Sequence, residues 1–180
     1  MNTDSWMWLL PVVFMIHDFE EILMIKVWVG KNRENLNRRF PGLARRLLPN
    51  FDRLSTAGLA VIAGEEFVLL AVLTGWCVER QGYALWAGLT LGFLLHLGMH
   101  IVQWLVYGGY VPVILTSLPA AVYCLWALAV LSARGLFTWG SAAVWGGIGL
   151  AVIVANYLLA TWLAHRYEAL VQAYAGGPAE

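Results

Sequence analysis

The chain has 180 residues, of which 61% are hydrophobic and 12% are charged, and its formal net charge is zero. Soluble domains carry roughly a quarter charged residues, so this composition indicates an integral membrane protein and excludes an ordinary soluble domain. The neutral net charge gives no reason to expect a nucleic-acid partner.

Five apolar segments have about the 20 residues that are needed to cross the hydrocarbon layer of a bilayer. The links between the second, third and fourth segments are very short, so we expect these three helices to be antiparallel neighbours. No linker is long enough to separate domains. We therefore predict one all-α, polytopic transmembrane bundle of about five helices over residues 1–180, with spans at 6–29, 54–78, 83–107, 111–131 and 138–163.

The link between the first two segments, residues 30–53, mixes basic and apolar side chains. It resembles a short interfacial amphipathic segment, interrupted at Pro41, that lies on anionic headgroups. A basic loop that only sets the topology explains the same residues equally well. By the positive-inside rule the N-terminus lies outside, and residues 30–53 and the C-terminus lie in the cytoplasm. We interpret the first segment as a retained helix, because no basic region precedes it as in a signal peptide.

Glycines recur on the third and fifth segments. Gly88 and Gly92 lie on the third, and Gly146 and Gly149 lie on the fifth. Small residues at this spacing allow membrane helices to approach each other closely. We expect them to serve packing.

Ionisable residues lie near the midpoints of the first three segments. His17, Glu66 and His96 fall within about 3 Å of helix rise from the expected bilayer centre. A charged side chain at that depth costs about 2.5–3.5 kcal/mol, and such residues mark functional sites. We therefore predict that the ionisable side chains of the three segments meet in one pocket: His17, Asp18, Glu20, Glu21, Glu65, Glu66, His96 and His100.

Carboxylates and neutral imidazoles are the ligands that zinc, iron and manganese share. A divalent metal would neutralise the acids, although protonation of the carboxyl groups would do so too. We predict that the site binds one or two divalent ions, which are zinc, iron or manganese. The predicted ligands are His17, Glu21, Glu66, His96 and His100. Glu20, Glu21 and Glu65 are the candidate catalytic acids and bases. Asp18, Gln103 and Tyr107 are expected to support the ligands through hydrogen bonds.

The pattern His17-x-x-Glu20-Glu21, with Glu65-Glu66 in the second segment and His96-x-x-x-His100-x-x-Gln103 in the third, resembles the HXXEE-domain family of small bacterial multi-pass membrane proteins. The likeness covers about residues 8–130. The family is named for its motif, so the resemblance implies the location of the site and a bacterial inner membrane, and no particular activity.

A looser similarity, in chemistry and not in kinship, links the Glu-Glu pair and the histidines to CAAX-type intramembrane endopeptidases. The arginine that follows the pair in those proteins is replaced by Leu70. Phe93 precedes His96 by three residues, whereas that family spaces phenylalanine and histidine by four.

Our favoured prediction is a membrane-embedded, metal-dependent hydrolase that acts on a lipidic or membrane-peptide substrate. The substrate would reach the site laterally or from the cytoplasmic face. A di-iron or di-manganese carboxylate oxidoreductase, an ion- or proton-coupled transporter and a metal-free Glu/His isomerase stay open. A purely structural polar network is the remaining alternative. The expected partners are membrane lipid and an apolar substrate, and the sequence leaves homo-oligomerisation open.

Overall fold

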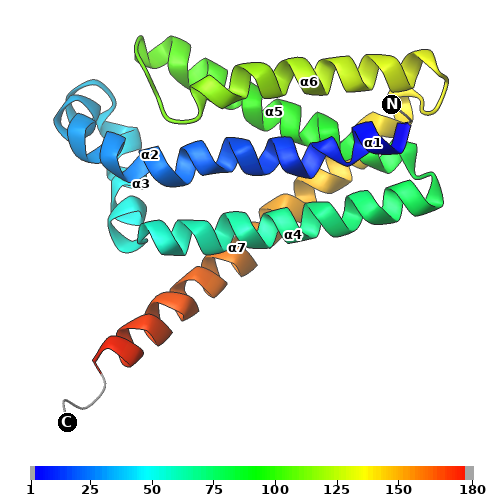
Figure 1. The fold of residues 1–180 in the computed structure, drawn as a ribbon. Helices are drawn as coiled ribbons and strands as arrows, with labels where there is room; N and C mark the ends of the chain where they lie inside the picture. The colour runs from blue at the N-terminus through cyan, green and yellow to red at the C-terminus, as the bar shows by residue number, and fades with distance from the viewer. Residues whose placement is uncertain (1–2, 177–180) are drawn as a thin grey trace.

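A computed structural model describes residues 3–176, which form helices and short connections with no strand in that range. This confirms the predicted all-α bundle (Figure 1). The helices are α1 (Thr3–Met7), α2 (Leu9–Arg39), α3 (Pro41–Arg53), α4 (Thr56–Arg80), α5 (Tyr83–Tyr107), α6 (Ile114–Ala133) and α7 (Trp139–Ala175).

Four helices, α4 to α7, are long and apolar enough to cross a membrane. They correspond to the second to fifth predicted segments, although α7 continues well beyond residue 163 to Ala175. The first predicted segment forms α2, a helix of 31 residues that also continues past its predicted end. With a rise of 1.5 Å per residue, α2 is about 46 Å long. α2 is not among these four helices, and its apolar part contains Asp18, Glu20 and Glu21, three of the five acids of the predicted site.

The bundle is organised around α5, which packs most extensively against α7 and α6. α5 also contacts α4, so the second, third and fourth segments are neighbours as predicted. α2 lies between α6 and α4 (Figure 1) and contacts both of them. α7 reaches the start of α4 at Glu168, which accepts a hydrogen bond of 2.7 Å from Ser55 N, and its last turns extend away from the other helices (Figure 1). Large buried side chains such as Trp86, Leu97 and Leu128 belong to the main hydrophobic core, to which α1, α2 and α4 to α7 all contribute.

α5 and α7 cross in near backbone contact at two glycines. A Cβ atom on Gly88 would lie 2.6 Å from Trp145 Cβ and 2.7 Å from the backbone nitrogen of Gly146. The predicted close approach is therefore confirmed at Gly88 and Gly146. The other two glycines do not take part in it, because a Cβ on Gly92 would meet its nearest neighbour at 4.0 Å and one on Gly149 would meet nothing.

Residues 30–53 are helical except at Phe40, as the amphipathic interpretation expects, and the alternative that they only set the topology stays open. The helix is interrupted at Phe40, and α3 begins at Pro41. Proline suits the first position of a helix, because its missing N–H would have no helical partner there. α3 folds back along α2, and Ala44 and Leu48 pack against Val29.

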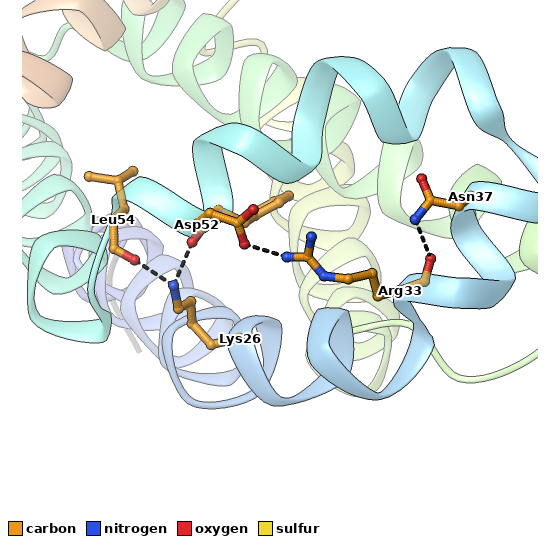
Figure 2. Close-up of polar contacts among 6 residues, drawn as sticks. Lys26, Arg33, Asn37, Asp52 and Leu54 are labelled. Atoms are coloured by element: carbon orange, nitrogen blue, oxygen red, sulfur yellow. Dashed lines mark hydrogen bonds and ion pairs between the residues drawn. The ribbon is translucent and has the colours of Figure 1, made fainter.

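Three side chains of α2 and α3 fasten this hairpin (Figure 2). Lys26 Nζ donates to the carbonyl oxygen of Phe51 and, at 2.7 Å, to that of Leu54. Arg33 forms an ion pair with Asp52. A helix after Pro41 is thus confirmed, while its contact with headgroups stays a prediction.

Candidate functional site

Three imidazoles from two helices converge inside the bundle. His17 comes from α2, and His96 and His100 lie on consecutive turns of α5. One ring nitrogen from each lies within 4.8 Å of the others. The Nε2 atoms of His96 and His100 are 3.0 Å apart. The ring of His17 lies 5.4 Å from that of His96 and 5.3 Å from that of His100, measured between centroids.

The histidine cluster is closed on one side and open on the other. His17 is fully buried and His100 is 9% exposed, whereas His96 is an exposed residue. Phe93, one turn before His96, forms an apolar wall, with ring centroids 5.7 Å from His17 and 6.3 Å from His96. The cluster is therefore reached from the outer surface of α5, beside His96.

The hydrogen bonds around Thr116 assign the tautomer of His17. The Thr116 hydroxyl donates to Glu20 Oε2 at 2.7 Å and lies 3.3 Å from His17 Nδ1. A hydroxyl has one proton, which the carboxylate takes, so its oxygen accepts from the Nδ1–H of His17. The lone pair of His17 is then on Nε2. That nitrogen is buried and has no hydrogen-bond partner among residues 3–176.

His100 is oriented in the same way by the next turn of its own helix. Its Nδ1 lies 3.1 Å from Oε1 of Gln103, an acceptor, so Nδ1 carries the proton. The Nε2 lone pair of His100 faces His96. Metal-binding histidines usually donate their second ring N–H to such an acceptor, which fixes the ring and its tautomer. Gln103 therefore has the supporting position that the sequence predicted.

Glu20, predicted as a catalytic acid or base, accepts hydrogen bonds from three donors. They are the Tyr110 hydroxyl at 3.0 Å, the Thr116 hydroxyl at 2.7 Å and the Thr116 backbone N–H at 2.9 Å. Thr116 is in the first turn of α6, where N–H groups lack a helical partner and the helix dipole favours an anion. Burial, followed by the hydrogen bond and charge of Glu20, raises the pKa of Tyr110 to about 12, so this hydroxyl stays a donor at neutral pH.

The other acids face α4 and α7 and not the imidazoles. Asp18 and Glu21 interact electrostatically with each other and with Glu66 of α4. Glu65 accepts a hydrogen bond of 2.8 Å from Asn156 of α7. In the described part of the chain, the group of ligand atoms within 4.8 Å of one another contains the three histidines and no carboxylate.

Tyr107 continues the His96–His100–Gln103 stripe of α5 but lies apart from the imidazoles. Its hydroxyl donates to Asn32 Oδ1 at 2.7 Å and accepts from Asn35 Nδ2 at 3.0 Å. It connects the end of α5 to the extension of α2.

Residues 8–127 match a family model described as "Protein of unknown function with HXXEE motif". The chain belongs to the HXXEE family. No curated protein and no solved structure matches it.

The three ionisable residues of the HXXEE motif serve three different helices. His17 joins the two histidines of α5, and Glu20 binds the first turn of α6 through Thr116. Glu21 lies near enough to Glu66 of α4 for the two acidic groups to affect each other electrostatically. One turn of α2 thus directs its ionisable side chains toward α4, α5 and α6. The Glu65-Glu66 pair of the pattern is divided in the same way, because Glu65 accepts a hydrogen bond from Asn156 of α7 and Glu66 lies near the acids of α2.

Sequence reasoning considered Thr116 as a source of supporting hydrogen bonds, without naming its partner, and did not find Tyr110. A signal existed for Thr116, because a hydroxyl residue in the first turn of an apolar segment combines a side-chain donor with a free backbone N–H. Tyr110 follows Gly108-Gly109 in the link before α6. Its contact with Glu20 depends on the path of that link, and no local pattern indicates it.

Proposed function

We propose that this HXXEE protein is a membrane-embedded, metal-dependent enzyme whose divalent ion is held by His17, His96 and His100. The observation that supports this most is the buried Nε2 of His17, which has no partner in residues 3–176 and lies within 4.8 Å of a nitrogen of each other histidine. Two ligands 2.0–2.1 Å from a tetrahedral ion are about 3.3 Å apart. The 3.0 Å between the Nε2 atoms of His96 and His100 is close to that value.

A ligand set of three imidazoles favours a single zinc ion over a di-iron or di-manganese centre. Di-metal carboxylate sites need carboxylates from several helices beside the histidines. Here Glu66 of α4 interacts with the acids of α2, and Glu65 is bound to Asn156. We therefore assign Glu21 and Glu66, which the sequence suggested as ligands, to the surroundings of the ion. Three histidines leave a fourth position open, as catalytic zinc sites require.

When bound, such an ion lowers the pKa of water and polarises a carbonyl or phosphoryl oxygen, which is the chemistry of a hydrolase. Glu20 and Thr116 hold His17 in the tautomer that presents Nε2, and Gln103 does the same for His100. Glu21 follows His17 by one helical turn but is directed toward α4, in the acid group that adjoins the imidazoles. We assign proton transfer to this adjoining group, through Glu21. Glu20 is a positioning residue, because three donors already occupy its oxygens.

The proposed substrate is lipidic or a membrane peptide that enters laterally beside His96, the exposed histidine of the cluster. We place the protein in a bacterial inner membrane with its N-terminus outside. The hairpin of α2 and α3, which holds Arg38, Arg39, Arg45 and Arg46, supports this orientation because basic segments stay in the cytoplasm.

Metal analysis of the purified protein tests the proposal. We expect about one zinc per chain, and visible cobalt bands of a tetrahedral site after exchange. Alanine at His17, His96 or His100 should remove the ion, while His165→Ala, at an exposed histidine of α7, should retain it. Size-exclusion profiles and helical circular dichroism show that each variant folds. A metal-free wild type after zinc loading, or zinc retained by a variant with alanine at all three histidines, would refute a histidine metal site and favour a structural polar network.

A further inference from the structure

A groove lies between α2 and the C-terminal end of α5, on the side where the basic hairpin begins. Its volume is about 380 Å³. Met24 and Val27 form part of its apolar wall, and Lys31, Asn32, Tyr107 and Tyr110 supply polar groups. No residue that lines it is acidic.

The groove runs along the same face of α2 as the proposed metal site. His17, Glu20, Met24, Val27 and Lys31 follow one another at steps of three or four residues, which places them along one side of a helix. Val27 is 66% exposed, so this part of the groove opens sideways onto the outer surface of the bundle. Tyr110 lines the groove and donates to Glu20, which connects the groove to Thr116 and His17.

The charges at its outer end are complementary to an anion. Lys31 is exposed, and its ammonium has no hydrogen-bond or ion-pair partner within residues 3–176. Arg39 donates to the carbonyl oxygen of Tyr107 at 2.8 Å and stacks near its ring, which holds a second cation beside the groove. The two cations follow an apolar stretch of α2, at the level where lipid headgroups meet a membrane helix.

We infer that this groove binds an anionic, phosphate-bearing lipid, with its headgroup at Lys31 and Arg39 and its chain directed along Met24 and Val27 toward the histidines. This inference goes beyond the proposed function, because it assigns a lipid-binding site next to the histidine cluster. Lys31 and His17 are separated by 14 residues, or about 21 Å of helix. A phosphate at Lys31 therefore lies far from the histidines, so we assign this lipid to binding and not to hydrolysis.

Lipid binding by the full chain in detergent tests the headgroup assignment. Native mass spectrometry compares phosphatidate, the neutral diacylglycerol with the same chains, and inorganic phosphate. We expect phosphatidate to bind at least fivefold more tightly than the other two, and Lys31→Gln to remove most of that preference. Arg166→Gln is the matched control, since Arg166 is an exposed cation of α7 that stacks on Trp162. Equal binding of diacylglycerol, an equal effect of the two substitutions, or tight binding of phosphate alone overturns the inference.

The direction of the chain is tested by photo-crosslinking. A phosphatidate with a diazirine at the end of its chain should label residues around Phe93 and His96, and one with the diazirine beside the phosphate should label Tyr107 or Tyr110. The reverse pattern overturns the inference. Neither measurement depends on bound metal, so a failure of the metal proposal and a failure of the lipid site are read separately.

Discussion

The Nε2 atoms of His96 and His100 face each other at 3.0 Å across one turn of α5. Gln103 holds the proton of His100 on Nδ1, so His96 must donate the proton of this contact. His17 presents a third ring nitrogen, which is buried and finds no donor in residues 3–176. Burying a polar atom without a partner costs about 1–3 kcal/mol. The arrangement is therefore unfavourable as a purely structural network and suits a bound cation.

Thr116→Val tests the link between Glu20 and His17. Valine has the shape of threonine but no hydroxyl, so His17 Nδ1 loses its acceptor and Glu20 loses one of three donors. Removing a hydrogen-bond partner of a metal-binding histidine lowers metal affinity by about 10- to 100-fold. Competition with a zinc chelator measures that affinity. Thr116→Ser should stay within about threefold of wild type, and an unchanged affinity in Thr116→Val would contradict this role.

Gln103→Leu and Gln103→Glu test whether Gln103 supports His100 as a hydrogen-bond acceptor. Leucine leaves the Nδ1–H of His100 without its acceptor, and we expect zinc affinity to fall by about 10-fold or more. Glutamate keeps an acceptor at the same place and adds a negative charge, so affinity should be retained or should rise. The same chelator titration reads both variants. A similar loss in both would show that Gln103 acts only by packing.

Much of the fold could be predicted because apolar length decides it. Segments of about 20 apolar residues can only cross a bilayer as helices, and the short links around α5 fix its two neighbours in sequence. The contact of α5 with α7 could not be predicted in the same way. It depends on Gly88 and Gly146, which are far apart in the chain and whose pairing needs the three-dimensional path.

Helical spacing also placed part of the candidate site. His96, His100 and Gln103 share a face of α5, and this spacing suffices to bring them together. It does not decide how α2 is rotated between its neighbours. That rotation directs His17 to α5 and Glu21 toward α4. The imidazoles and the acids, which we predicted to share one pocket, therefore form two adjoining groups.

Gly88→Ala tests the crossing of α5 and α7. The added methyl group would lie 2.6 Å from Trp145 Cβ and 2.7 Å from Gly146 N, closer than atoms pack without a shift of the helices. Overpacking of this kind costs about 1–3 kcal/mol of the free energy of unfolding. Gly98→Ala is the control on the same helix, because nothing lies within 4 Å of its Cβ position. Thermal unfolding in detergent should separate the two variants, and equal stability would show that the helices are not in contact there.

The junction of α2 and α3 offers two polar contacts of unequal strength. The last carbonyl groups of α3 lack helical partners, and the partly buried Lys26 binds the oxygens of Phe51 and Leu54. Hydrogen bonds to a charged group contribute about 1.5–3 kcal/mol, so Lys26→Met should loosen α3 markedly. The ion pair of Arg33 and Asp52 is 44% and 54% exposed, and such pairs contribute about 0–1 kcal/mol. Arg33→Gln should thus have little effect.

Limited trypsin digestion measures this difference, because the exposed Arg45 and Arg46 of α3 become cleavable when the helix opens. We expect cleavage there to be roughly 10-fold faster in Lys26→Met than in Arg33→Gln, which follows from about 1.4 kcal/mol of difference between the two contacts. The comparison is internal, since both substitutions remove one cation from the same hairpin. Faster cleavage in Arg33→Gln would mean that the exposed ion pair, and not Lys26, holds α3 against α2.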